Sequence, residues 1–354
     1  MNIFIMRFSF HIPVPTPRLE YMYEGVKKAE ECGFFGIFYA DHTTMSPQKG
    51  TGTCYDAYCY LTALAMITKK VKLCTGVSDC HRFHPALMAH KVATLDQISN
   101  GRAMIGLGAG EAMNIDMYGL SRKRSVSKLK EYIILLRKFW TEKRINHKSD
   151  FWGEIKNAFI EINPIQESPP IYIAANGPKT RQITGELGDG WYPLYQPPWV
   201  IKKNIKEVKD AAKNAGRDPD EIDYVYDCFV AIDDDNPKNT EKRCEFFKSS
   251  YLLNSWITNE AYPGLDLPED ISVHDFGLGR NNALDVFRHI NRLPETILQD
   301  FNCLGTTEDV IASIEKYKEA GITHISMMNR GPDPNKVYEI FRDNIIPYFE
   351  ELEK

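Results

Sequence analysis

Residues 71–107, VKLCTGVSDCHRFHPALMAHKVATLDQISNGRAMIGL, contain a strand, a helix and a second strand in immediate succession. The runs Val71–Val77 and Ala103–Leu107 are short and apolar, as buried strands of a parallel sheet are. Between them, Pro85–Ile98 has the pattern of a helix with a proline in its first turn. The stretch therefore predicts two parallel strands joined by a crossover helix.

The same unit recurs along the whole chain. The strands that we expect cover residues 2–8, 34–39, 71–77, 103–107, 171–175, 190–194, 223–232 and 322–328. The helices that we expect cover residues 19–33, 55–68, 85–98, 126–140, 178–187, 200–215, 307–320 and 334–352. Eight strand-then-helix units predict an α/β fold, a single closed (β/α)8 TIM barrel over residues 1–354. Two excursions interrupt it, at about 141–170 and 233–305, and we expect the second to be a mostly helical insertion over the C-terminal mouth.

The composition narrows the class of protein. The chain has 354 residues, of which 43% are apolar and 26% charged, and its formal net charge is −5. This is the balance of a globular chain with a full core, and it lacks the basic excess of a nucleic-acid binder. No apolar run reaches the roughly 18–20 residues of a membrane span, and the first residues lack the long apolar region of a signal peptide. We therefore expect a cytoplasmic protein with a small-molecule substrate, without nucleic-acid or membrane partners, that forms a homodimer or a larger homo-oligomer.

The cysteines and histidines do not indicate a disulfide framework or a metal site. The eight cysteines form no CxxC pair, so free thiols are expected. Cys80, His81, His84 and His90 lie close in sequence, but their spacing matches no zinc pattern. We expect no metal.

Polar and glycine residues follow several of the expected strands, and in such barrels the chemistry lies at those strand ends. In chain order these residues are Asp41 and His42; Gly76, Val77, Ser78 and Asp79; Gly108, Ala109, Gly110, Glu111 and Asn114; Asn176, Gly177, Pro178, Lys179 and Thr180; and Met328, Asn329 and Arg330. The sequence therefore predicts a functional site at the C-terminal mouth of the barrel.

The residue types at these strand ends indicate particular chemistry. A histidine beside a carboxylate, as in Asp41-His42, can exchange a proton near neutral pH. The glycines of 106–111 do not fit the GxGxxG dinucleotide pattern. They favour close approach of the backbone to a flat ligand, with Glu111 pointing into the mouth, although a plain glycine turn is the alternative. Residues 176–180 open a helix with a proline and free N–H groups, so they predict either an anion site or an ordinary helix start.

Four segments carry a resemblance to a known family. They are AEECGFFGIFYADH at 29–42, residues 71–114 ending in GLGAGEAMN, IYIAANGPKTRQITGELGDGW at 171–191 and GTTEDVIASIEKYKEAGITHISM at 305–327. Together they resemble the luciferase-like superfamily of barrel flavoenzymes, and within it the branch that uses the 5-deazaflavin coenzyme F420. The ADH and GxGEAxN segments are similar to F420-dependent secondary-alcohol and glucose-6-phosphate dehydrogenases. ATLDQISNGRAMIGLG at 93–108 is similar to methylenetetrahydromethanopterin reductase.

The resemblance implies a role for each residue that matches the family pattern. His42 and Glu111 would be the catalytic pair that exchanges the substrate proton. Gly76 and Val77 would form a non-proline cis peptide behind the deazaflavin ring. The remaining cofactor-binding residues would be Asp41, Ser78, Asp79, Ala109, Gly110 and Asn114 near the ring, with Asn176, Gly177, Pro178, Thr180 and Arg181 toward the phosphate.

The implied function is an F420-dependent oxidoreductase that transfers a hydride between the deazaflavin and a small organic substrate. That substrate would be an alcohol or ketone, or a methylene-tetrahydropterin. The sugar-phosphate branch carries a lysine after the sixth strand, where this chain has Tyr195-Gln196-Pro197-Pro198, which disfavours glucose 6-phosphate. An FMN-dependent monooxygenase of the same superfamily, with FMN as cofactor, and a non-catalytic flavin-binding barrel are the alternatives.

Overall fold

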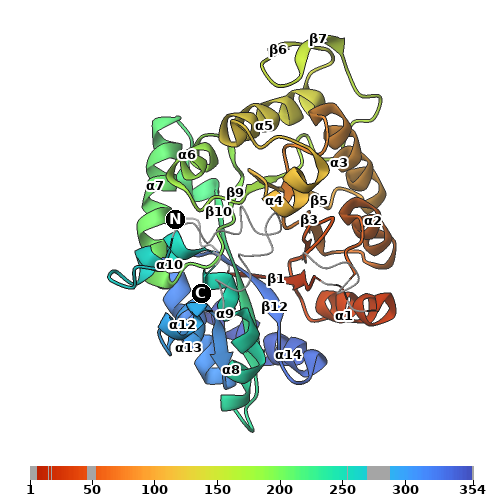
Figure 1. Cartoon of the computed structure of the whole chain (residues 1–354). Coiled ribbons are helices and arrows are strands. Elements are labelled where there is room, and N and C mark those ends of the chain that lie inside the picture. The colour runs from red at the N-terminus through yellow and green to blue at the C-terminus, as the bar shows by residue number, and fades with distance from the viewer. Residues whose placement is uncertain are drawn as a thin grey trace.

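The computed structural model describes residues 6–14, 16, 18–45, 53–252, 254–268 and 288–352. Within these residues, eight parallel strands close into a barrel (Figure 1). In ring order they are β1 (Arg7–Ile12), β2 (Gly36–Tyr39), β3 (Lys72–Thr75) with its continuation β4 (Ser78–Asp79), β5 (Ala103–Gly108), β8 (Ile171–Ile173), β9 (Gly190–Trp191), β10 (Asp223–Ile232) and β12 (His324–Asn329). The last strand pairs with the first, from Arg7 opposite His324 to Phe10 opposite Met327. The predicted (β/α)8 fold is confirmed.

Helices follow the strands and surround the barrel (Figure 1). They are α1 (Leu19–Glu31), α2 (Ala57–Ile67), α3 (Pro85–Ser99), α5 (Ser125–Thr141), α6 (Pro178–Leu187), α7 (Pro198–Asn214), α13 (Thr307–Glu319) and α14 (Pro334–Ile340), which continues through a π-helical turn (Phe341–Ile345) into α15 (Ile346–Glu351). Local sequence fixes several ends. His84 accepts the N–H of Ala86 at 3.1 Å before the first-turn proline of α3, and Thr306 and Asp309 form a reciprocal capping box at α13.

The first strand differs from its expected position. We expected residues 2–8, of which 2–5 lie outside the described residues, whereas the described strand is Arg7–Ile12. Its pattern alternates, because Phe8 and Phe10 pack outward against helices while the polar Ser9 and His11 lie inside. The apolar run at the N-terminus hid this alternation.

Both excursions have secondary structure of their own. Residues 141–170 contain an antiparallel hairpin of β6 (Ile145–Ser149) and β7 (Gly153–Ala158), which projects beyond α5 (Figure 1). Residues 233–305 contain α8 (Lys238–Cys244), a 3-10 turn (Glu245–Phe247), α9 (Lys248–Leu252), α10 (Ser255–Ala261), a second turn (Ile290–Arg292) and α12 (Ile297–Phe301), then β11 (Cys303–Gly305), which pairs with β10. Residues 253 and 269–287 of this excursion lie outside the described residues.

The barrel interior is filled by side chains. An apolar layer contains Phe38, Cys74, Met104, Tyr172, Tyr192 and Val225. Toward the N-terminal ends of the strands, His324 bonds Ser9 at 2.7 Å and Asp223 at 2.8 Å, which satisfies the buried polar groups there. In the part of the chain that the structure describes, no helix combines the length and apolarity needed to span a membrane.

Candidate active site

Asp41 is the buried carboxylate at the end of β2. Ser78 donates its hydroxyl hydrogen to Oδ2 of Asp41 at 2.7 Å, and Nη2 of Arg82 lies 3.1 Å from the same oxygen. Burial raises the pKa of Asp41, while the Arg82 charge and the Ser78 hydrogen bond oppose that rise. Asp41 therefore anchors the strand end to the loop after β3 through these two contacts.

Arg82, which the sequence did not single out, links two predicted site residues. Its guanidinium joins Asp41 to Asp79, and Nε of Arg82 bonds Oδ2 of Asp79 directly. The other oxygen of Asp79 accepts the backbone N–H groups of His81 at 2.6 Å and Arg82 at 2.9 Å. The carboxylate of Asp79 is thus bound within the protein by its own turn and by Arg82.

His42 is held through its Nδ1 atom. Oδ1 of Asn114 accepts the backbone N–H groups of Thr43 at 2.8 Å and Thr44 at 3.3 Å. This fixes the orientation of the amide, so that Nδ2 of Asn114 donates to Nδ1 of His42 at 2.6 Å. Burial lowers the pKa of His42 to about 4, and the Arg82 charge adds to the shift. At neutral pH the ring is uncharged and carries its hydrogen on Nε2.

Glu111 presents a carboxylate oxygen with no hydrogen-bond partner. Its Oε2 atom is buried and unpartnered, and it lies 3.9 Å from Nδ1 of His42. Burial raises the pKa of Glu111 to about 7, and the charge of Asp79 adds to the rise while Arg82 opposes it. A carboxyl group that titrates near neutrality at a barrel mouth is suited to exchange protons.

The segment between β3 and β4 contains the predicted cis peptide. The Gly76–Val77 peptide is cis. A Cβ at Gly76 would lie 3.3 Å from Phe38 and 3.4 Å from the hydroxyl of Tyr192, and a Cβ at Gly106 would lie 2.2 Å from the carbonyl oxygen of Thr75. Glycine thus permits β3 and β5 to approach one another closely below the site.

The turn before Glu111 also depends on a glycine. Gly110 has φ of 90°, and a Cβ there would lie 2.1 Å from Ile115. Nε2 of His81 lies 3.0 Å from the carbonyl oxygen of Ala109, which secures the preceding residue. This turn carries Glu111 from the end of β5 into the mouth.

The segment 176–181 follows β8 and has its own network. Asn176 accepts the backbone N–H of Leu194 at 3.0 Å, Thr180 donates to the carbonyl oxygen of Gly177 at 2.8 Å, and the buried Arg181 pairs with Glu207 at 2.8 Å. Gly177 is the N-cap of α6 and Pro178 its first residue. Among the described residues, no hydrogen bond or ion pair joins this segment to the cluster around Asp41 and Glu111.

A second histidine–carboxylate pair lies inside the barrel, and the sequence did not reveal it. Nδ1 of His11 lies 3.0 and 2.9 Å from the two oxygens of Asp227, and the hydroxyl of Tyr192 lies 3.2 Å from the same nitrogen. The signal for it was polar alternation: Ser9 and His11 in β1, and Asp223 and Asp227 in β10. Across residues 6–45, 53–268 and 288–352, apart from the single positions not described, no group of three His, Cys, Asp or Glu side chains is arranged to hold a metal.

Comparisons with known proteins agree with this architecture. Residues 1–324 match the family described as luciferase-like monooxygenase. The chain is 29% identical over 330 residues to 5,10-methylenetetrahydromethanopterin reductase of Methanolobus tindarius, covering 90% of this chain and 94% of the relative. It is 27% identical over 326 residues to F420-dependent glucose-6-phosphate dehydrogenase of Microbacterium testaceum, covering 90% of each.

Two solved structures have the same fold. The coenzyme F420-dependent tetrahydromethanopterin reductase of Methanopyrus kandleri superposes with a TM-score of 0.81 at 24% identity, covering 97% of this chain and 99% of that one. An F420-dependent secondary alcohol dehydrogenase, solved with an F420-acetone adduct, superposes with a TM-score of 0.77 at 23% identity, covering 96% and 97%.

Proposed function

The chain belongs to the luciferase-like monooxygenase family of enzymes, and we propose that it is an oxidoreductase that uses the deazaflavin coenzyme F420. The observation that carries the proposal is Glu111, whose buried and unpartnered Oε2 lies beside a neutral His42 at the mouth. Two relatives named F420-dependent glucose-6-phosphate dehydrogenase, which match 90% and 92% of this chain, support the choice of cofactor.

The residues present fit a flat, hydrogen-bonding ring. The mouth offers the Nε2–H of His42 as a donor and Oε2 of Glu111 as an unused acceptor. Asp41, Gly76, Val77, Ser78, Asp79, Ala109, Gly110 and Asn114 would surround the ring, and Asn176, Gly177, Pro178, Thr180 and Arg181 would lie toward the phosphate. When bound, the deazaflavin supplies the carbon that accepts or donates the hydride.

The protein's own part of the reaction is proton transfer. When the substrate loses a hydride from a carbinol carbon, its hydroxyl proton must also leave, and Glu111 as the carboxylate accepts it. In the reverse direction the protonated Glu111 returns it. His42 donates a hydrogen bond from Nε2 to the substrate oxygen, because Asn114 occupies its Nδ1. Two polar groups from different strands thus orient the substrate and move its proton.

The substrate that we propose is an alcohol or ketone, or a methylene-tetrahydropterin. The relatives comprise both a tetrahydropterin reductase and dehydrogenases, so they support both classes. The stretch Tyr195–Pro198 has no lysine to meet a sugar phosphate, which argues against glucose 6-phosphate.

The test is equilibrium titration of the purified chain with F420 and, separately, FMN, followed by hydride exchange with a panel of alcohols, ketones and a methylene-tetrahydropterin. We expect the lower dissociation constant for F420 and exchange with members of one substrate class. Tighter binding of FMN, with oxygen consumption in the presence of a reductant, would identify a flavin monooxygenase instead. Tight binding without exchange would identify a binding protein.

A further inference from the structure

Arg330 faces the mouth from the wall opposite Glu111. In β12, His324 and Ser326 point into the barrel, where they bond Ser9 and Tyr192. The backbone N–H of Arg330 donates to the carbonyl oxygen of Val230 at 2.8 Å, so the pairing of β12 with β10 continues to this residue. Arg330 lies an even number of residues from His324 and Ser326, and its side chain therefore faces the same side of the strand. In the ring of eight strands, β12 and β5 are four places apart, which is the greatest separation possible.

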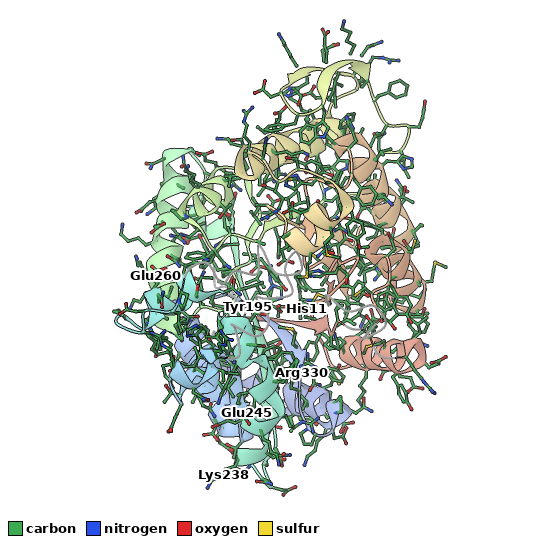
Figure 2. The ribbon with its side chains drawn as sticks, viewed as in Figure 1. His11, Tyr195, Lys238, Glu245, Glu260 and Arg330 are labelled. Atoms are coloured by element: carbon green, nitrogen blue, oxygen red, sulfur yellow. The ribbon has the colours of Figure 1, made fainter. Side chains whose placement is uncertain are left out.

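Two aromatic rings hold the guanidinium. Its central carbon lies 4.5 Å from the ring centroid of Phe247 and 5.4 Å from that of Phe229. These phenylalanines belong to the apolar cluster between β10 and the 233–305 excursion. In Figure 2, Arg330 lies between the centre of the molecule, where His11 and Tyr195 are labelled, and the outer segment that carries Glu245 and Lys238. The rings fix the plane of the fork and restrict its motion.

The guanidinium has no counter-charge among the described residues. Its Nε is buried without a hydrogen-bond partner, and within residues 6–268 and 288–352, so far as they are described, no carboxylate forms an ion pair with it. Burial lowers the pKa of Arg330, but a guanidinium remains charged at neutral pH. A half-buried cation without an anion costs the fold stability, and an anionic ligand would offset that cost.

The charges of Glu111 and Arg330 both act on Tyr195. Burial raises the pKa of Tyr195 to about 12, the charges of Asp227 and Glu111 add to the rise, and the charge of Arg330 opposes it.

We propose that Arg330 is an anion-binding residue, and that the ligand held in the mouth carries a carboxylate or phosphate group that bonds its guanidinium fork. A planar fork with free donors suits such groups, because it can make two parallel charge-assisted hydrogen bonds. The inference rests on the proposed function only for the identity of the ligand: the anion belongs either to the substrate or to the cofactor. If it belongs to the substrate, the site selects, within the proposed alcohol, ketone and tetrahydropterin classes, those members that also carry an acid group.

Calorimetric titration with inorganic phosphate and with benzoate tests the site, using the full chain with and without F420. We expect at least one of the two anions to bind the wild-type protein, and Arg330→Met to weaken that binding by about tenfold to a hundredfold. Arg330→Lys keeps the charge without the fork and should lie between the two. The matched control is Arg144→Met, since Arg144 stacks at 4.4 Å on Phe159 in the hairpin, away from the mouth. It should leave the dissociation constant unchanged.

The two arms separate the sources of the anion. Phosphate or benzoate binding that survives saturation with F420 assigns the anion to the substrate. Competition with F420, together with a similar loss of F420 affinity in Arg330→Met, assigns it to the cofactor. If F420 does not bind but Arg330-dependent anion binding persists, the anion site stands and the proposed function fails. Equal affinity of wild type and a folded Arg330→Met, confirmed by thermal denaturation, or no anion binding in either arm, overturns the inference.

Discussion

A single amide, that of Asn114, sets both the position and the tautomer of His42. Its Oδ1 accepts the N–H of Thr43 at 2.8 Å, and its Nδ2 donates to Nδ1 of His42 at 2.6 Å. The imidazole therefore accepts a hydrogen bond at Nδ1 and carries its own hydrogen on Nε2, from which it can donate. A histidine in that state orients a substrate oxygen well and abstracts a proton poorly, so the two candidate catalytic residues divide the work unequally.

Replacing Asn114 by aspartate should change the state of His42. A carboxylate beside Nδ1 stabilises the imidazolium, so in Asn114→Asp the pKa of His42 should rise from about 4 by on the order of 1–3 units. Nitrogen-15 chemical shifts of the imidazole, followed against pH, give both the pKa and the tautomer. In the wild type they should report a neutral ring protonated at Nε2 down to about pH 5. A wild-type ring protonated at Nδ1 would contradict the assignment.

The pH dependence of turnover should follow Glu111. With its pKa near 7, the carboxylate form needed to accept a proton grows as pH rises through 7, so oxidation of a carbinol should rise over that range and level off above it. The reverse reaction should fall over the same range. Glu111→Gln should remove this dependence of the rate on pH and lower kcat by on the order of 10²–10⁴-fold.

The comparison variant for that experiment is His42→Asn, which keeps a donor of similar reach. It should lower kcat less than Glu111→Gln does, and the rate should still change with pH near 7. Cofactor dissociation constants measured on both variants at matched folded fraction separate a loss of chemistry from a loss of binding. If the rate of His42→Asn no longer changes with pH near 7, His42 and not Glu111 is the residue that transfers the proton.

Glu111 should also cost the folded protein stability at high pH. Its folded pKa of about 7 lies above the usual carboxyl value near 4.5, so between these values the folded state binds more protons than the unfolded state. The free energy of unfolding therefore falls as pH rises from about 4.5 to 7, and the deficit persists above 7.

Glu111→Gln should be more stable than wild type by on the order of 1–3 kcal/mol at pH 8 and nearly equal at pH 4. Denaturant titrations at both pH values measure it. A variant less stable than wild type at pH 8 would contradict the buried carboxylate.

Sequence periodicity was sufficient for the barrel because most of the parallel strands are short apolar runs, and a helical stretch separates each expected strand from the next. The rule that sites lie at strand ends then selected Asp41, His42 and Glu111 without structural information. In the structure Asp41 pairs with Arg82 at 3.1 Å, and Glu111 lies 3.9 Å from the imidazole of His42 that Asn114 holds. Their position at the strand ends follows from local sequence and topology alone.

The sequence could not supply contacts between distant strands. Arg82 lies in a loop whose neighbouring histidines drew attention to metals, and its two carboxylate partners are 41 and 3 residues away. His11 was missed because the expected strand ended at residue 8, and Asp227 because one carboxylate in an alternating strand is ambiguous. Their pairing across 216 residues follows only from barrel closure.

The His11–Asp227 pair gives a separate prediction about the interior. Asp227→Asn keeps the shape but removes the carboxylate that holds Nδ1 of His11 at 2.9 Å. Without it the imidazole of His11 loses a buried hydrogen-bond partner, so Asp227→Asn should lower the free energy of unfolding by about 1–3 kcal/mol. Denaturant titration of both proteins measures the loss. No loss would show that the pair does not stabilise the barrel.

Arg82 should be the most costly single charge to remove from the site. Its loss leaves Asp41 and Asp79, both buried, facing one another without a cation, so Arg82→Met should lower the free energy of unfolding by about 3–5 kcal/mol. The surface pair of Arg124 with Asp150 is the control, and Arg124→Met should cost less than about 1 kcal/mol because both side chains are mostly exposed. The double variant Arg82→Met, Asp79→Asn should recover part of the loss at pH 7, because only one buried carboxylate then remains. Equal costs for Arg82→Met and Arg124→Met would mean that this cluster does not depend on its ion pairs.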